Sequence, residues 1–265
     1  MNNDKQKRIE IFEDTLQQIK NIDKLKKSTK YSIENTILYN EDYNYILPNN
    51  PNRKGIIKVI DSRTFKASKG LENVAILNFA SATNPGGGVK NGSVAQEECL
   101  CRCSNLYPCL KTNYLMDNFY LFHRNRHNTL YTDRIIYSKD IIVFKEDIKE
   151  PIMSKEDDWF KVNIITSPAP NLREVKNINQ KELLNIFKSR IEKILKVAII
   201  NGNTNIVLGA FGCGAFKNPP YLVAKAYQEV LVKYKNYFDN IIFAVLTTPG
   251  NGGDENFKTF SRVLK

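Results

Sequence analysis

The sequence lacks any apolar run long enough to cross a membrane, since a membrane helix needs about 20 such residues in succession. Its first residues, MNNDKQKRIEIFEDTLQQ, also lack the apolar centre of a secretion signal. Low-complexity tracts and internal repeats are absent as well. At 265 residues, of which 42% are hydrophobic, the chain is long enough to bury a substantial core. We therefore expect a soluble, cytoplasmic protein with no membrane partner.

Histidine and cysteine are scarce, with two and five residues respectively. An odd number of cysteines in a chain without an export signal favours free thiols. Cys103, Cys109, His123 and His127 give the pattern C-x5-C-x13-H-x3-H, which is similar to a zinc site. Its first gap is longer than the usual spacing of about two to four residues. We therefore predict no metal site.

Basic residues outnumber acidic ones, 39 to 28, and the formal net charge is +11. A basic surface favours polyanionic partners through charge attraction and counterion release. The basic residues are scattered along the chain, so the charge also fits a role in solubility alone. No zinc module, concentrated basic helix or glycine-aromatic RNA motif is present. Direct nucleic-acid binding rests on net charge only and is left open.

Strand-like apolar runs alternate with helical patterns from residue 54 onward, as is typical of a sheet covered by helices on both faces. The predicted strands lie at 73–80, 135–137, 141–144, 162–166, 205–210 and 241–246. The predicted helices lie at 93–107, 110–122, 180–201 and 221–234. These patterns predict a single α/β/α domain over residues 54–265.

Residues 1–53 differ from the rest of the chain. Ile9, Phe12 and Leu16 recur at helical intervals, and a second helix is predicted at 20–27. A polar stretch follows and ends in a turn rich in proline and asparagine. We predict an N-terminal helical accessory segment packed on the core.

The most informative motif is the triplet Gly86-Gly87-Gly88, followed after seven residues by Gln96-Glu97-Glu98. Backbone without a Cβ can approach a phosphate or a sugar closely. The triplet follows a predicted buried strand, and open α/β sheets bind ligands at the carboxyl ends of their strands. The motif is more typical of a catalytic loop than of a helix start with acidic residues.

This region, LNFASATNPGGGVKNGSVAQEE over residues 77–98, resembles the GGG-X(6–8)-QEE signature of the poly(ADP-ribose) glycohydrolase family. It is most similar to the compact bacterial-type branch. A second stretch, LGAFGCGAFKNP over residues 208–219, resembles the second ligand loop of that branch. The resemblance implies a three-layer α/β/α macrodomain with a mixed sheet and no metal or other cofactor.

The resemblance also implies the chemistry. In the family, the second acid is catalytic, which is Glu98 here, and Glu97 supports it. The target bond joins the ribose of one ADP-ribose unit to a ribose hydroxyl of the next. Its hydrolysis needs a proton for the departing oxygen as an oxocarbenium-like centre develops. A carboxylic acid with a raised pKa can give that proton and then accept one from the attacking water.

The second loop lies between a predicted strand and a predicted helix, where backbone amides can converge on a diphosphate. Phe211 and Phe216 within it either wall a ribose or adenine ring or pack beneath the loop, and Cys213 is interpreted as a small filler. Asn78 and Asn84 can order a ribose hydroxyl. The animal members carry an asparagine where this chain has Ser81. The predicted ligand-binding residues are Asn78, Asn84, Gly86, Gly87, Gly88, Gln96, Gly209, Ala210, Phe211, Gly212, Cys213, Gly214, Ala215 and Phe216.

The leading hypothesis is a glycosidase that acts on poly(ADP-ribose) or an ADP-ribosylated macromolecule and yields ADP-ribose. One alternative is a module that binds ADP-ribose without cleaving it, although such a reader does not need the pair Glu97-Glu98. A second is a hydrolase that removes ADP-ribose from DNA or protein.

Overall fold

The computed structural model describes residues 2–175, 177–247 and 253–265. Its centre is a seven-stranded mixed sheet with the order β1-β4-β5-β3-β6-β7-β2. The strands are β1 Thr36–Tyr39, β2 Ile56–Ile60, β3 Val74–Phe79, β4 Ile135–Val143, β5 Phe160–Ser167, β6 Asn205–Leu208 and β7 Asn240–Ala244. β4 pairs antiparallel with β1 and β5, whereas the other neighbours are parallel.

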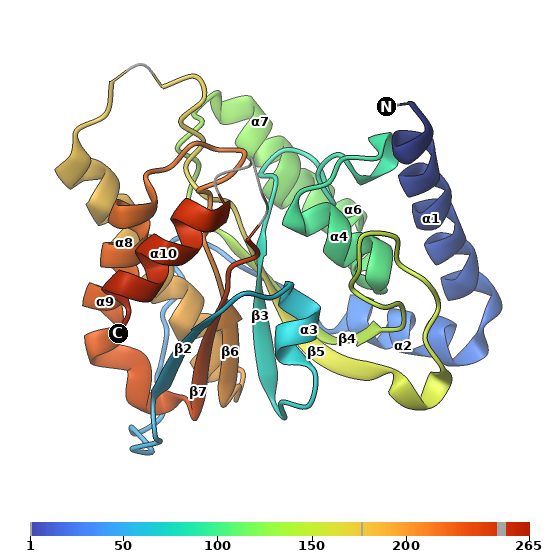
Figure 1. Cartoon of the computed structure of the whole chain (residues 1–265), viewed down its shortest axis with the longest axis horizontal. Helices are drawn as coiled ribbons and strands as arrows, with labels where there is room; N and C mark the ends of the chain where they lie inside the picture. The colour runs from blue at the N-terminus through green and yellow to red at the C-terminus, as the bar shows by residue number, and fades with distance from the viewer. Residues whose placement is uncertain (1, 176, 248–252) are drawn as a thin grey trace.

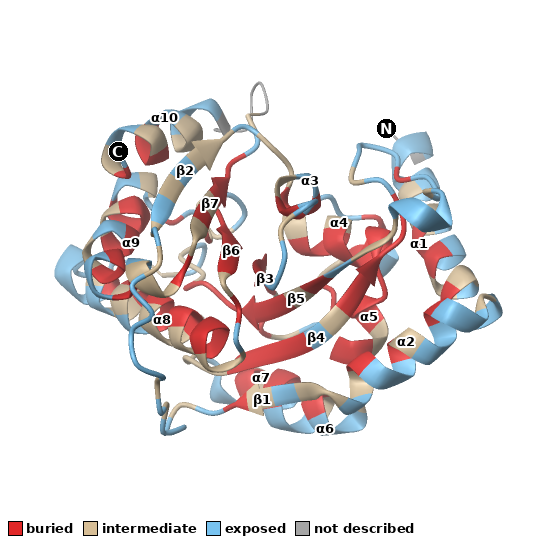
Figure 2. Ribbon diagram, turned by 90° about the horizontal axis from the view of Figure 1, so that it is seen from below, coloured by how far each residue is buried: buried red, intermediate tan, exposed pale blue. Residues whose placement is uncertain are grey.

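Helices cover both faces of the sheet (Figures 1 and 2). One face carries α8 Gln180–Ile200, α9 Pro220–Tyr234 and α10 Gly253–Val263, and the other carries α1 Asn2–Asn21, α2 Asp23–Glu34, α4 Gln96–Cys103 and α5 Leu106–Leu110. The shorter helices are α3 Thr64–Ser68, α6 Asn113–Leu115 and α7 Phe122–Arg126. Buried side chains form a large cluster on each face. The predicted α/β/α architecture is confirmed.

β3 occupies the middle of the sheet, and its position determines where the site forms. Residues 74–78 of this strand are buried, as their continuous apolar pattern predicts. Parallel neighbours β5 and β6 flank β3 on its two sides. The chain therefore leaves β3 and β6 at the same edge of the sheet, which brings the two glycine-rich loops together.

Two edge strands were not predicted. β1 joins the sheet beside β4, so the first 53 residues are not helical throughout and contribute directly to the sheet. β2 pairs only with β7 at the opposite edge. Both strands are partly exposed and lack the long buried run of the central strands. The boundary at residue 54 stays a prediction.

The predicted helix at 93–107 is interrupted at Ser104. This residue makes an isolated bridge with Val143 of β4, and α5 begins after it. The predicted helix at 110–122 is likewise divided, with a π-helical segment Met116–Leu121 between α6 and α7. Helical spacing in the sequence did not reveal these breaks, and the first of them depends on the contact of Ser104 with the sheet. Within the described residues, no helix is long and apolar enough to span a membrane.

Candidate active site

A cavity of about 980 Å³ lies at the carboxyl ends of β3, β6 and β7. The loop after β3 and the loop after β6 both line it, and so do Glu97 and Glu98 of α4. Its volume is at the upper end of the range of about 300–1,000 Å³ that small-molecule sites occupy. The structure thus joins the two motifs that lie more than a hundred residues apart in the sequence.

Close contacts with neighbouring side chains require glycine in the triplet. Gly87 has a φ of +59°, and a Cβ built there would lie 2.5 Å from Glu98 Oε1 and 3.0 Å from Glu97 Oε2. Gly86 also has a positive φ, and a Cβ there would lie 2.8 Å from the Tyr107 ring. Any side chain at these positions would therefore displace the loop or the carboxylates.

Glu98 is buried yet has a free oxygen. The backbone N–H of Gly88 donates a 2.8 Å hydrogen bond to Glu98 Oε1. Oε2 of the same side chain has no hydrogen-bond partner among the described residues. The side chain is 6% exposed and lines the cavity. A buried carboxylate oxygen without a partner is costly unless a ligand engages it, which makes Glu98 a candidate for ligand contact.

Glu97 differs from Glu98 in that both of its carboxylate oxygens accept hydrogen bonds from the protein. Its Oε2 accepts a 2.7 Å hydrogen bond from the Ser81 N–H, and its Oε1 accepts a 3.3 Å bond from Asn78 Nδ2. Burial raises the pKa of Glu97 to about 8, the nearby Glu98 charge adds to this rise, and the two hydrogen bonds oppose it. The two acids therefore differ: donors hold both oxygens of Glu97, while one oxygen of Glu98 is buried without a donor among the described residues.

Gln96 has a structural task. Its Nε2 donates to Leu77 O at 2.7 Å and to Thr64 Oγ1 at 3.1 Å, and its Oε1 accepts from the Phe79 N–H at 2.9 Å. These bonds hold the start of α4 against the end of β3. Asn78, for its part, is fully buried behind Glu97 and does not line the cavity. The structure thus gives Asn78 contacts within the protein in place of the direct ligand contact that we predicted, whereas Gln96 also lines the cavity and its ligand contact stays a prediction.

The second loop divides into lining and supporting residues. Ala210, Gly212, Gly214, Ala215 and Phe216 line the cavity, whereas Gly209 and Cys213 do not. A Cβ at Gly214 would meet no atom within 4 Å, so this glycine borders open space.

Phe211 corrects one sequence expectation. Its ring is fully buried beneath the loop and packs edge-on against Phe187, with 6.0 Å between the ring centres. It belongs to the core and not to the cavity wall, because the chain turns inward at this point. Phe216 does line the cavity.

Asn84, Gly87 and Gly88 of the first loop also line the cavity, whereas Gly86 is buried beneath it.

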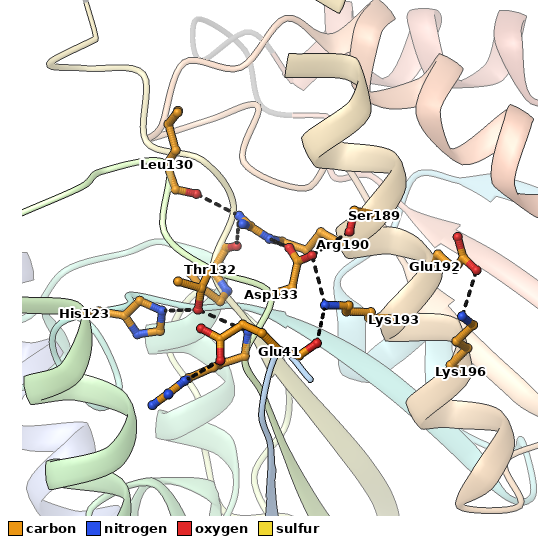
Figure 3. Close-up of polar contacts among 12 residues, drawn as sticks. Glu41, His123, Leu130, Thr132, Asp133, Ser189, Arg190, Glu192, Lys193 and Lys196 are labelled. Carbon is orange, nitrogen blue, oxygen red and sulfur yellow. Dashed lines mark hydrogen bonds and ion pairs between the residues drawn. The ribbon is translucent and has the colours of Figure 1, made fainter. Parts of the chain in front are cut away.

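Tyr131, Ala169 and Asn171 are among the lining residues that the sequence did not predict. They lie on two loops that Arg190 of α8 holds from behind (Figure 3). The Arg190 guanidinium donates to Leu130 O at 3.1 Å, to Pro168 O at 2.8 Å and to Asp133 Oδ1 at 3.0 Å. Neither Tyr131 nor Asn171 lies in one of the two loop motifs, so those motifs provide no signal for them.

Three of the four residues of the zinc-like pattern make hydrogen bonds within the protein. His123 Nδ1 contacts Phe119 O at 2.7 Å, and its Nε2 contacts Thr132 Oγ1 at 3.0 Å. Cys103 and Cys109 donate to the carbonyls of Glu146 and Asn105. The part of the chain that the structure describes contains no group of three or more His, Cys, Asp or Glu side chains placed to hold a metal.

Together, the mixed α/β/α sheet, the glycine-rich loops and the buried carboxylate pair define a glycoside hydrolase with a macrodomain-like fold. The model of the microbial-type poly(ADP-ribose) glycohydrolase catalytic domain matches residues 6–146, and the chain belongs to this family. The family resemblance seen in the two loop motifs is therefore confirmed. None of the curated proteins matches the chain.

Solved structures agree with this assignment. The poly(ADP-ribose) glycohydrolase of Thermomonospora curvata is 29% identical, with 97% of this chain and 98% of that chain covered and a TM-score of 0.81. The enzyme of Deinococcus radiodurans in complex with ADP-ribose is 33% identical, with 89% and 96% covered and a TM-score of 0.76. A further Thermomonospora structure contains the inhibitor ADP-HPD, at 29% identity and a TM-score of 0.81.

Proposed function

We propose that this chain is a poly(ADP-ribose) glycohydrolase that cleaves the O-glycosidic bond between two ribose units and releases ADP-ribose. Family membership supports the reaction, and the structures of relatives with ADP-ribose and ADP-HPD support the ligand class. The observation that carries the residue assignment is the free Oε2 of Glu98, which is buried at the cavity wall below the glycine loop.

Glu98 is the general acid and then the general base in this proposal. Its carboxyl group gives a proton to the departing ribose oxygen as the bond from that oxygen to the anomeric carbon breaks. Water attacks the oxocarbenium-like carbon, and the Glu98 carboxylate accepts a proton from this water. Both steps balance, because the proton lost in the first step is regained in the second.

Glu97 positions the substrate and helps to keep a proton in the site. Since burial raises the pKa of Glu97 to about 8, Glu97 retains its proton at neutral pH. The Ser81 N–H and Asn78 fix the Glu97 carboxyl, so it can hold a ribose hydroxyl in one orientation. Gly87 allows the loop backbone to lie directly over both acids.

The second loop is proposed to hold the diphosphate. Gly212 has a φ of +74°, and Asn218 Nδ2 fixes the loop by donating to Gly212 O at 3.0 Å and to Pro170 O at 2.7 Å. Backbone amides near Gly214 then face the open cavity, with Phe216 as a wall. Phe211 has no place in ligand binding in this proposal.

A cytoplasmic location is also proposed. All five cysteines are free, which fits a reducing compartment. Three of them, Cys101, Cys103 and Cys109, are buried in the core that packs against the catalytic loop.

The test is incubation of the pure protein with poly(ADP-ribose), with ADP-ribosylated DNA and with a mono-ADP-ribosylated protein. Release of ADP-ribose from the polymer, identified by mass, supports the proposal. Release only from DNA or from the monomodified protein, or binding without release, would contradict it.

A further inference from the structure

Arg124 of α7 contacts the first glycine loop without lining the cavity. Its Nε donates a 2.7 Å hydrogen bond to Thr83 O, and its Nη2 donates to Asn84 Oδ1 at 3.3 Å. Asn84 lines the cavity, whereas Arg124 does not. The guanidinium therefore holds a cavity-lining side chain from outside the ligand space.

The helical run that carries Arg124 contains a π-helical segment. α6, the segment Met116–Leu121 and α7 follow one another without a break (Figure 1). Such segments are rare and occur frequently at functional sites, and the wider turn changes the direction of the side chains that follow it. The His123 ring anchors the run, because it contacts Phe119 O at 2.7 Å and Thr132 Oγ1 at 3.0 Å. Arg124 thus reaches the loop from an irregular helix that is fixed in place.

The contact with Arg124 determines how the Asn84 amide is oriented. A guanidinium can only donate hydrogen bonds, so the amide oxygen faces it. The amide nitrogen of Asn84 carries two hydrogens and donates one of them to Thr83 Oγ1 at 3.1 Å. The second has no acceptor among the described residues, so it can be donated to a ligand oxygen. Asn84 therefore presents a donor, and not an acceptor, to the cavity.

The turn that Arg124 holds is bonded to Glu97. Ser81 Oγ accepts hydrogen bonds from the N–H groups of Thr83 and Asn84, at 3.3 and 3.1 Å. The Ser81 N–H in turn donates to Glu97 Oε2 at 2.7 Å. The position of the turn therefore affects the donor that holds this acid.

The same turn is also bonded to the segment that holds Glu98. The Gly87 N–H donates a 3.0 Å hydrogen bond to Asn84 O, and the next residue, Gly88, donates to Glu98 Oε1 at 2.8 Å. A shift of Asn84 therefore shifts the backbone donor of the second acid. Both carboxyl groups depend on the turn that Arg124 contacts.

We propose that Arg124 is a positioning residue that acts through the turn Thr83–Asn84. It orients the Asn84 amide so that an N–H meets a ligand oxygen, and it holds the loop where its backbone donors meet Glu97 and Glu98. The effect on rate rests on the proposed function, whereas the effect on ligand affinity does not require turnover. Arg124 belongs to neither of the two loop motifs.

The test uses Arg124→Ala in the full chain, which removes both bonds to the turn. We expect affinity for ADP-ribose, measured by calorimetry, to fall about 2- to 10-fold, the range that one net hydrogen bond supplies. We expect kcat on poly(ADP-ribose) to fall at least about tenfold, because small displacements of catalytic groups lower the rate steeply. Unchanged affinity and kcat would overturn the proposal.

A double-mutant cycle with Asn84→Ala separates orientation of the amide from general support of the fold. If Arg124 acts on affinity through Asn84, Arg124→Ala causes little further loss of ADP-ribose affinity once residue 84 is alanine. A residue that only stabilises the fold would lower affinity equally in both backgrounds. Additive losses would therefore overturn the proposal.

The matched control is Arg126→Ala on the same helix. Arg126 is exposed, and its guanidinium lies 5.2 Å from the centre of the Phe122 ring, so the variant removes the same charge at the surface. It should keep the native affinity and kcat. An equal loss in this control would assign the effect to net charge and overturn the positioning role.

Arg124→Lys keeps the charge but lacks the forked donors that bridge two acceptors. Its affinity and kcat should lie between those of the native protein and Arg124→Ala, and native values would show that charge alone suffices. If Arg124→Ala fails to fold, the cycle with Asn84→Ala is measured with Arg124→Lys. If the native protein fails to hydrolyse polymer, the proposed function fails, while the cycle on ADP-ribose affinity still decides the role of Arg124.

Discussion

The Gly88 N–H donates a 2.8 Å hydrogen bond to Glu98 Oε1 and leaves Oε2 of the same carboxyl group without a partner. One oxygen is therefore fixed by the glycine loop, and the other is buried without a hydrogen-bond partner among the described residues. A ligand that orders this loop also orders the acid, so binding and catalysis depend on the same backbone.

Gly87→Ala tests that dependence. The new Cβ would lie 2.5 Å from Glu98 Oε1, and the residue would have to keep a φ of +59°. We expect hydrolysis to fall at least about tenfold, because displacement of a catalytic group from its productive geometry lowers the rate steeply. Steady-state kinetics on poly(ADP-ribose) measures the loss.

Gly202→Ala is the matched control. Gly202 also has a positive φ, of +74°, but a Cβ there would meet nothing within 4 Å. It should cost about 1 kcal/mol of stability through backbone strain and leave activity unchanged. Equal activity losses in both variants would mean that strain, and not contact with the acids, explains the effect at Gly87.

The raised pKa of Glu97 predicts that the free energy of unfolding depends on pH. Its pKa rises from an ordinary value of 4.5 to about 8 in the folded protein, so the folded state binds the additional proton. The resulting contribution to stability is fully present below about pH 4.5 and is lost as the pH rises through about 8. Glu97→Gln should remove this contribution, so the unfolding free energy of the variant depends less on pH across this window.

Urea denaturation of both proteins at several pH values measures this difference. Parallel curves for native protein and variant would contradict the assigned pKa. Activity provides a second measurement, since kcat/KM should decline above about pH 8, where Glu97 loses its proton.

Gly214→Val tests the second loop. Because a Cβ at Gly214 meets no atom within 4 Å, the fold should tolerate valine, which projects into the cavity. We expect ADP-ribose binding to weaken by at least ~1–3 kcal/mol, the cost of polar groups left unpaired. Adenosine, which has no phosphates, should lose much less. Calorimetry measures the affinity of the variant for both ligands. Equal losses of affinity for ADP-ribose and adenosine would show that the loop does not contact the diphosphate.

Arg190→Met tests the support behind the cavity wall. Arg190 is buried and joins Asp133 to the carbonyls of Leu130 and Pro168 (Figure 3). Loss of one partner of a buried ion pair costs about 3–5 kcal/mol, and ADP-ribose affinity should fall because the wall is released.

The control lies on the same helix. Lys188 pairs with Glu229 at 2.7 Å near the surface, so Lys188→Ala should cost at most about 1 kcal/mol and leave ligand affinity intact. Thermal denaturation measures the stability of each variant, and calorimetry measures its affinity for ADP-ribose. A loss at Arg190 no larger than that at Lys188 would contradict its supporting role.

The central strands and the long helices were predictable from the sequence because each is buried along a continuous pattern. β3 and α8 match their predicted ranges within a residue at each end. β1 and β2 escaped prediction because edge strands pair on one side and remain partly exposed. The break at Ser104 depends on its bridge to Val143, a contact that no local pattern encodes.

Prediction of the site from the sequence was limited in the same way, because contacts between distant segments leave no local pattern. Glycine spacing and the adjacent acids predicted which loops meet, because both features are local. The roles of Gln96, Asn78 and Phe211 depend on which atoms the folded chain places beside them, and they became clear only from the contacts. Tyr131 reaches the cavity from a loop with no motif, so only the three-dimensional arrangement identifies it.

The most direct measurement is single-turnover hydrolysis of poly(ADP-ribose) by Glu98→Gln, together with ADP-ribose binding by the same variant. Glutamine keeps the size and the Gly88 contact but cannot transfer the proton. We predict native-like binding and a rate reduced by about 10²–10⁴ or more, with a smaller loss for Glu97→Gln. Native-like turnover by Glu98→Gln, or a larger loss at Glu97 than at Glu98, would contradict the account.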